Sequence, residues 1–310
     1  MRTAGRPGTG AHRLLAEVTE SECLPGNHHR LVLKAPPIAA DAAPGQFVNV
    51  WCHPPEEIEH PPCAAILRRP YSISRLRPPD GLEMLLRVRG IGGRMLAEKQ
   101  VGDKLDVIGP LGRGFQLRPG LRRAVVVAGG IGLAPVPFLL ETLASQGVQV
   151  TLLAGAADEA ALPYRVARTG RAVATLPELA ALGAEVSFVS EAVEGRLVTE
   201  LLESLLGQLD PAQDEVMAVG PRAMLKKIAG LTEGRIRTQV SLEERMACGV
   251  GACRSCVVPA LPGEGLNSDM TESLAGVGTP ALQSGLAYKT VCRDGPVFYA
   301  DEIDWERLDP

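Results

Sequence analysis

The chain has 310 residues, of which 45% are hydrophobic and 22% charged, and a formal net charge of −4. These values are typical of a globular protein with two or three domains, and they exclude an intrinsically disordered chain. Acidic and basic residues are interspersed without a basic stripe, so we expect no nucleic-acid partner. Glycines and prolines interrupt the most apolar stretch, residues 124–140, so we expect no membrane span. Residues 1–15 predict a short flexible tail without an export signal.

Short runs of alternating or β-branched character, separated by Pro and Gly, fill the first 120 residues. Their spacing predicts an antiparallel β-barrel as the first domain, residues 1–120. The predicted strands lie within residues 29–36, 44–51, 71–76, 82–90 and 104–112. Residues 52–63 are rich in proline, which predicts an exposed loop because proline does not fit a central strand.

From residue 121 the pattern becomes an alternation of buried strands and amphipathic helices, which predicts a parallel sheet in an α/β domain over residues 121–235. The expected strands are residues 122–130, 148–156, 184–191 and 214–221, and the expected helices are residues 134–147, 197–209 and 221–231. Residues 236–310 form a third domain that is too small to hold a large core alone, so a metal centre would stabilise it. The expected fold class is therefore multidomain.

Three cysteines lie within nine positions in the stretch ACGVGACRSC. Cys248, Cys253 and Cys256 have the spacing C-x4-C-x2-C, and Cys292 follows, which is the plant-type [2Fe-2S] pattern. The intervening glycines would allow backbone amides to approach the sulfur atoms. A structural zinc site usually has two C-x2-C pairs or histidines, and unligated buried thiols would not need this spacing. We therefore predict four cluster ligands.

The other three cysteines, Cys23, Cys52 and Cys63, have no matching spacing, and we interpret them as ordinary residues. Cys52 and Cys63 flank one loop, so a second, minor site between them stays open as an alternative. Seven cysteines, clustered rather than spread through a small scaffold, argue against a disulfide framework. The expected location is accordingly the reducing cytoplasm.

The stretch RRPYSIS has the side chains that a flavin needs. Arg69 can pair with a pyrophosphate, Tyr71 can lie against a planar ring, and Ser72 can donate a hydrogen bond to that ring. About twenty residues later, Gly92 and Gly93 are predicted at a helix start, where free amides can face phosphate oxygens. Each stretch alone would equally fit a structural turn.

Two further stretches indicate a nicotinamide nucleotide. The sequence AGGIGLAP follows a predicted strand, and Gly129, Gly130 and Gly132 would let the backbone approach a pyrophosphate. In AVGPRAMLKKI, Gly220 and Pro221 follow the last predicted strand, where open α/β sheets bind ligands, although a plain strand-to-helix turn explains them equally well. Asp158 is a candidate ribose acceptor with no nearby arginine for a 2′-phosphate, which favours NAD over NADP.

Taken in order, RPYS, GGIGLAP, AVGP and CGVGACRSC with VCRDGPVF resemble the ferredoxin reductase superfamily, and the whole chain looks like the electron-transfer subunits of dihydroorotate dehydrogenase B. The resemblance implies an FAD-binding β-barrel, an NAD-binding α/β domain and a C-terminal [2Fe-2S] domain. It implies flavin contacts at Arg69, Pro70, Tyr71, Ser72, Leu86, Arg87, Val88, Gly92 and Gly93, and cluster ligation by Cys248, Cys253, Cys256 and Cys292.

The resemblance also implies an oxidoreductase subunit that passes electrons between NAD(H), FAD and the cluster. Its implied partner is an FMN-containing catalytic subunit that oxidises dihydroorotate to orotate in pyrimidine biosynthesis, in a heterotetramer of two plus two. The sequence has no hydrolytic motif, and we predict no catalytic side chain because the chemistry belongs to the cofactors. Two alternatives stay open. One is a related NAD(P)H-dependent reductase subunit of the ferredoxin:NADP oxidoreductase, hydrogenase or sulfite reductase type, and the other is a non-catalytic, zinc-stabilised nucleotide-binding module.

Overall fold

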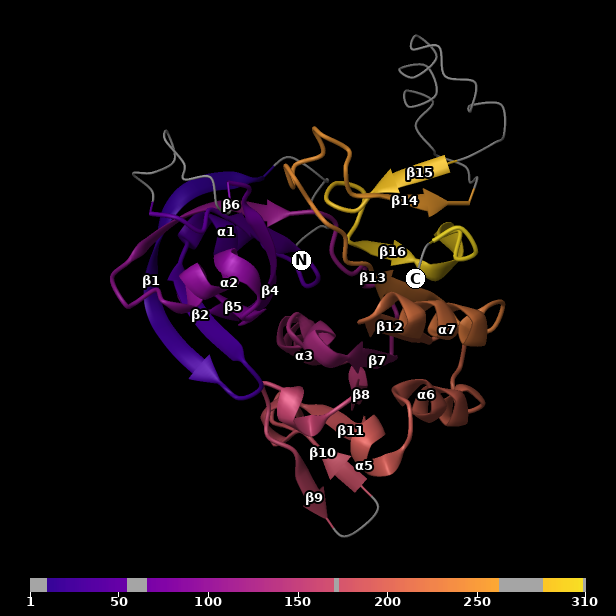
Figure 1. The fold of residues 1–310 in the computed structure, drawn as a ribbon. Helices are drawn as coiled ribbons and strands as arrows, with labels where there is room; N and C mark the ends of the chain where they lie inside the picture. Colours follow the sequence, from indigo (N-terminus) through magenta and orange to yellow (C-terminus); the bar gives the residue numbers. More distant parts are fainter. Residues whose placement is uncertain (1–9, 55–65, 170–172, 262–286, 309–310) are drawn as a thin grey trace.

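A computed structural model describes residues 10–54, 66–169, 173–261 and 287–308. Figure 1 shows a β-barrel from the first third of the chain, a large sheet with helices on both faces, and a C-terminal segment beside the barrel at the β13 edge of the sheet. Within these residues, no helix has both the length and the apolar character that crossing a membrane requires.

Six strands form the barrel, and each pairs antiparallel with its neighbours in the closed order β1-β2-β5-β4-β3-β6. This arrangement confirms the predicted barrel. Its interior is filled by fully buried aliphatic side chains such as Leu31, Ile73 and Met84. The strands are β1 (His12–Leu24), β2 (His28–Lys34), β3 (Phe47–Val50), β4 (Arg69–Arg77), β5 (Gly81–Arg87) and β6 (Lys104–Leu111), with helices α1 (Pro36–Asp41) and α2 (Gly90–Ala97).

The prediction of a flexible tail was wrong for residues 12–15, because they begin β1. This strand closes the barrel by pairing with β2 on one side and β6 on the other. Ala16 and Val18 point inward and are fully buried, whereas Glu17 is exposed to solvent. A closing strand with such a polar outer face carries only a weak hydrophobic signal.

The second part is an eight-stranded sheet in the order β16-β13-β12-β7-β8-β11-β10-β9. Its central strands pair in parallel, as predicted from the alternation of strands and helices. They are β7 (Arg123–Gly129), β8 (Gln149–Ala156), β11 (Ala184–Ser190) and β12 (Asp214–Val219), and the helices are α3 (Val136–Ser145), α4 (Pro177–Ala180), α5 (Glu191–Glu194), α6 (Val198–Leu206) and α7 (Arg222–Thr232). Two short antiparallel strands, β9 (Ala167–Thr169) and β10 (Val173–Thr175), extend one edge.

The C-terminal segment adds strands to this sheet. β13 (Thr238–Ser241) pairs in parallel with β12, and β16 (Val297–Tyr299) pairs antiparallel with β13. Between them, β14 (Val257–Ala260) and β15 (Ala287–Thr290) form a separate antiparallel pair. The sheet therefore continues past residue 235, the boundary that the sequence predicts for the second domain.

Apolar packing joins the three parts of the molecule. One continuous cluster of buried side chains contains Phe47 and Leu111 from the barrel, Val216 from the sheet, and Val258 and Val291 from the C-terminal segment. On the other side of the sheet, Phe138 of α3 packs into the barrel core. The barrel, the sheet and the C-terminal segment are therefore held in fixed relative positions.

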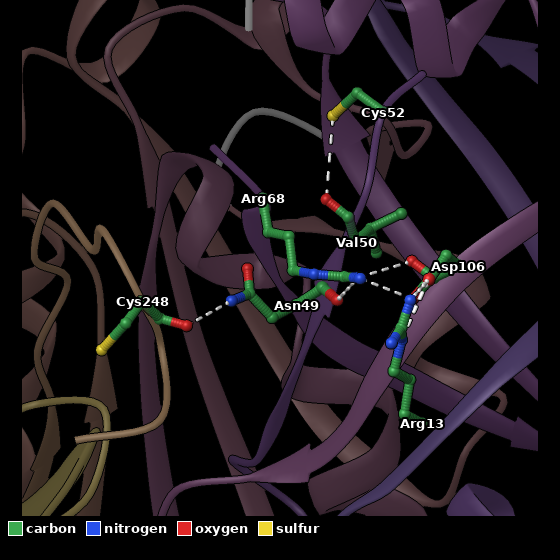
Figure 2. A network of polar contacts seen from close by, with 7 residues as sticks. All are labelled: Arg13, Asn49, Val50, Cys52, Arg68, Asp106 and Cys248. Atoms are coloured by element: carbon green, nitrogen blue, oxygen red, sulfur yellow. Dashed lines mark hydrogen bonds and ion pairs between the residues drawn. The ribbon is translucent and has the colours of Figure 1, made fainter. Parts of the chain in front are cut away.

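An ion network around a buried carboxylate reinforces the barrel where β1, β6 and the segment just before β4 meet (Figure 2). The side chain of Asp106 on β6 is 4% exposed and accepts hydrogen bonds at 2.6 Å from both Arg13 and Arg68. Arg68 also donates to the Asp106 backbone carbonyl at 2.9 Å. Burial alone would raise the pKa of Asp106, but the hydrogen bonds and charges of the two arginines outweigh it and hold that pKa below its usual value.

Replacing Asp106 with Asn should lower the free energy of unfolding at pH 7 by roughly 3 kcal/mol, because Arg68, whose side chain is only 14% exposed, loses its carboxylate partner. A lowered native pKa gives a stabilisation that is complete above the unfolded carboxyl value of about 3.9 and is lost as the pH falls below it. The difference in the free energy of unfolding between wild type and variant, measured by urea unfolding, should therefore become smaller below about pH 4.

Asp80→Asn is the matched control, because Asp80 pairs with Lys34 at 3.7 Å on the surface. Such exposed pairs contribute at most about 1 kcal/mol. Equal stability of the Asp106→Asn variant and the wild type at pH 7 would contradict the role of the network.

Candidate metal centre and cofactor sites

The β14–β15 pair brings two of the four predicted cluster ligands together. Val257 lies opposite Thr290 in this pair, so Cys256, just before β14, comes next to Cys292, just after β15. The backbone amide of Cys292 points at the Cys256 sulfur, 3.4 Å away, and both cysteines are buried. Of the 35 residues between these two cysteines, residues 262–286 lie outside the described part of the chain.

Backbone amides surround the cysteine sulfurs. The amides of Val250 and Cys253 donate to the Cys248 sulfur at 3.5 and 3.4 Å, and the amide of Gly251 donates to the Cys292 sulfur at 3.1 Å. The loop folds this way because Gly249 and Gly251 adopt φ of +71° and +83°, which side chains disfavour. Amides aimed at sulfur stabilise negative charge there, so this donor set fits an iron–sulfur cluster held by thiolates.

The thiols differ in how readily they lose a proton. A hydrogen bond with the Ser255 hydroxyl, followed by backbone hydrogen bonds, lowers the pKa of the exposed Cys253 to about 6. Burial, with the neighbouring Cys256, raises the pKa of Cys292 to about 12. In the part of the chain that the structure describes, no three metal-binding side chains converge on a point for a single ion. A two-iron cluster does not need such convergence, because its four thiolates are divided between two irons.

A barrel residue holds the cysteine loop in place, and the sequence did not reveal it. Asn49 on β3 donates from Nδ2 to the carbonyl oxygen of Cys248 at 2.9 Å (Figure 2). The loop packs so closely that a Cβ atom on Gly249 would lie 2.4 Å from the same Nδ2. The available signal was a lone amide in the apolar run FVNVW, where every residue of the strand is buried.

The predicted flavin-binding residues lie on the barrel near this contact. Arg69, Pro70, Tyr71 and Ser72 are half-buried on β4, which pairs with β3 so that Pro70 lies opposite Asn49. Burial raises the pKa of Tyr71 well above its usual value, so its phenol stays neutral.

The second predicted flavin stretch meets the first at the start of α2. Leu86 and Arg87 end β5, and the Val88 amide donates to the Asn27 carbonyl at 2.9 Å. Gly92 and Gly93 lie in the first turn of α2, and a Cβ atom on Gly92 would be 3.5 Å from Nε of Arg69. The structure therefore brings the arginine and the glycine-rich helix start together, an arrangement that suits a pyrophosphate.

The two predicted nucleotide stretches also meet. Gly129 ends β7, and Gly130 and Gly132 lie in the 3-10 turn Gly130–Leu133 before α3. A Cβ atom on Gly132 would lie 2.4 Å from the carbonyl oxygen of Val219, and one on Gly220 would lie 3.1 Å from the Gly129 amide nitrogen. Only glycine permits this close approach of two strand ends, where ligands bind in open α/β sheets. Pro221 follows directly and is the N-cap of α7.

The remaining candidate residues are Asp158 and the cysteines outside the cluster motif; of these, Cys52 lies beside the predicted flavin residues, because a Cβ atom on Gly92 would be 3.2 Å from its sulfur. Asp158 is exposed, and one of its carboxylate oxygens caps a short 3-10 turn by accepting from the Ala160 amide at 2.9 Å. Cys23 is exposed on β1. Cys52 is buried, and burial raises the pKa of its thiol to about 11. Cys63 lies outside the described residues, so the possible second site between Cys52 and Cys63 stays untested.

Solved structures with the same arrangement include two ferredoxin-NADP reductases. An NADH-dependent reduced ferredoxin-NADP oxidoreductase matches with a TM-score of 0.71 and 23% identity, over 95% of this chain and 91% of the other. A ferredoxin NADP+ reductase from Neisseria gonorrhoeae matches with a TM-score of 0.57 and 18% identity, over 77% and 96% of the two chains. The barrel joined to the parallel sheet therefore defines the ferredoxin reductase fold.

Sequence similarity is more specific. Residues 243–269 match the family described as the iron-sulfur cluster binding domain of dihydroorotate dehydrogenase B. The electron transfer subunit of dihydroorotate dehydrogenase B (NAD(+)) from Desulforamulus reducens is 35% identical over 90% of this chain and 94% of its own length. The corresponding subunit from Geobacillus thermodenitrificans is 35% identical over 94% and 95%. The chain belongs to the family of electron transfer subunits of dihydroorotate dehydrogenase B.

Replacing Cys253 with Ser should remove iron and inorganic sulfide from the purified protein while FAD stays bound, because the predicted flavin residues lie on the barrel. The iron and sulfide content should fall by more than about tenfold, which is the typical loss in metal affinity when only a residue outside the ligand set is removed. Chemical determination of iron, sulfide and flavin per chain tests this. Cys23→Ser, an exposed thiol on β1, is the control, and full iron content in Cys253→Ser would remove Cys253 from the ligand set.

Proposed function

We propose that the chain binds FAD and a [2Fe-2S] cluster and passes electrons between NAD(H) and a catalytic subunit that interconverts dihydroorotate and orotate. The observation that carries the proposal is the direct contact between the cysteine loop and β3, the strand paired with the predicted flavin strand. Membership of the family supports the same assignment.

The proposed cluster ligands are Cys248, Cys253, Cys256 and Cys292. The proposed flavin site consists of the β4 motif, the end of β5 and the start of α2, with residues Arg69, Pro70, Tyr71, Ser72, Leu86, Arg87, Val88, Gly92 and Gly93. The proposed nicotinamide site lies where β7 and β12 end, with residues Gly129, Gly130, Gly132, Gly220 and Pro221. We assign the barrel to residues 1–120, the nucleotide-binding domain to residues 121–235 and the cluster domain to residues 236–310.

Bound FAD supplies both two-electron exchange with nicotinamide and one-electron exchange with iron and sulfur. The residues of the chain position and tune these groups. Arg69 provides a fixed positive charge beside the helix start at Gly92, and the neutral Tyr71 offers a flat surface on β4. The amides around Cys248 and Cys292 stabilise the additional negative charge of a reduced cluster.

The relatives are named as electron transfer subunits, and a subunit of that kind works with a catalytic partner. We propose an FMN-containing partner, a heterotetramer of two plus two, a cytoplasmic location and a role in pyrimidine biosynthesis. NAD is favoured over NADP because Asp158 follows β8, the second strand of the sheet in chain order, where an acidic residue that binds the ribose is expected.

The direct test is to co-express the chain with the dihydroorotate-oxidising subunit from the same genome and to purify the complex. We expect a yellow-brown complex with flavin and iron–sulfur absorbance that reduces NAD+ when dihydroorotate is added. A complex that contains both cofactors but reduces a ferredoxin instead would favour the related reductase. A colourless, zinc-containing protein would favour the non-catalytic module.

Replacing Arg69 with Ala should weaken FAD binding by about 2 kcal/mol, or roughly 30-fold in Kd, because a charged hydrogen bond to phosphate is lost. Arg69→Lys should recover part of the affinity, since lysine keeps the charge but not the planar guanidinium. Fluorescence titration of the deflavinated protein with FAD measures this. Arg165→Ala, at a side chain that is 82% exposed, is the control, and unchanged affinity in Arg69→Ala would exclude the residue from the site.

A further inference from the structure

Asn49 differs in character from the strand that carries it. All four residues of β3 are buried, and Asn49, at 1% exposure, lies between the fully buried Val48 and Val50. A buried amide that served only packing would be replaceable by an aliphatic residue without losing a bond. Here its Nδ2 group makes a specific bond to the backbone of Cys248, the first cysteine of the cluster loop.

The backbone of Asn49 is fixed on both sides. It lies opposite Pro70 of β4 on one side and opposite Ile108 of β6 on the other. Arg68, just before β4, ties this region to β6 through its bonds to Asp106, and the Trp51 amide donates to the Asp106 carbonyl at 2.9 Å. Figure 2 shows the ion network and Asn49 as neighbours within one polar region of the barrel. Asn49 is therefore a rigid point from which a loop can be positioned.

The amide has one defined orientation. Only an N–H group can donate to the Cys248 carbonyl, so Nδ2 must face the loop. The other atom, Oδ1, is buried and has no hydrogen-bond partner among the described residues. In Figure 2, Oδ1 points away from Cys248. An unused buried acceptor marks a place where a further donor, from water or from a bound group, would fit.

We propose that Asn49 is a positioning residue that fixes the first cluster ligand against the flavin strand and sets the cluster's reduction potential. The inference rests on the proposed function, since it requires both cofactors. Its physical basis is a single side chain that contacts the Cys248 backbone and also belongs to the strand paired with the RPYS motif.

The sign of the effect on the potential follows from charge. The N–H end of the Asn49 amide carries partial positive charge and points at the backbone of a cluster ligand. Reduction adds one negative charge to the cluster, and a nearby positive dipole end stabilises that charge. Removing the dipole should lower the midpoint potential, and a carboxylate in its place should lower it further.

Asn49→Leu and Asn49→Asp test the proposal in the complete complex. Both keep the approximate size of the side chain and lose the donor. We expect both variants to retain FAD, iron and sulfide. A redox titration followed by electron paramagnetic resonance should give a lower midpoint potential for the cluster in both, and the larger decrease in Asn49→Asp. After rapid reduction of the flavin by NADH, the rate at which the cluster becomes reduced should fall about tenfold, the cost typical of losing an outer-shell partner.

Gln46→Glu is the matched control. Gln46 lies one residue before β3, and its side-chain amide donates to the Gly112 backbone carbonyl at 2.8 Å, so this variant also loses an amide-to-carbonyl bond in the barrel. We expect a similar decrease in melting temperature and no change in cluster potential. If the Asn49 variants only lower the melting temperature, as this control does, and leave the potential and rate unchanged, the positioning role is wrong.

Gly249→Ala perturbs the same contact from the other side. Its Cβ atom would lie 2.4 Å from Nδ2 of Asn49, so the loop must move away while Asn49 itself is intact. We expect the same downward shift in potential and the same slower cluster reduction, and a potential equal to that of the wild type would contradict the proposal. Failure of the proposed function can be told apart from failure of this inference. In the first case the wild-type protein itself would lack flavin or cluster, before any variant is compared.

Discussion

One hydrogen bond, from the Asn49 amide to the Cys248 carbonyl, joins a barrel strand to a loop 199 residues further along the chain. Two groups that exchange electrons must stay close and in fixed orientation, even when separate segments bind them. In this chain the predicted flavin strand and the predicted cluster loop both contact β3. The distance between the two sites therefore depends on one short strand rather than on a flexible linker.

Packing makes this arrangement stiff. Cys256 and Cys292 belong to the same buried cluster as Phe47 of β3 and Val216 of the sheet. Core side chains are close-packed, so a displacement of one element has to be accommodated by its neighbours. The ion network of Arg13, Arg68 and Asp106 stabilises the opposite side of β3. Both predicted cofactor sites are thus built on the rigid part of the molecule, where binding geometry is best preserved.

The sequence predicted the barrel and the parallel sheet, which the structure confirms, whereas the cofactor roles of its cysteine and glycine motifs stay predictions. The cysteine spacing, the glycines near the strand ends and the alternation of strands and helices each depend on residues close together in the chain. Contacts between distant segments were not predictable in the same way. Asn49 appeared only as one polar residue in an apolar run, and its partner is far away in the sequence. β1 was missed because its outer face is polar, and β13 was not predicted as part of the sheet because its place there depends on pairing with β12 and β16.

That pairing has a consequence for how the protein is built. Because β13 and β16 complete one side of the sheet, a chain ending near residue 235 would leave β12 with an unpaired row of amides and carbonyls. An exposed apolar strand of this kind invites association with other chains. The C-terminal segment that carries the cysteine loop is accordingly an integral cover for this edge of the sheet rather than a separable module.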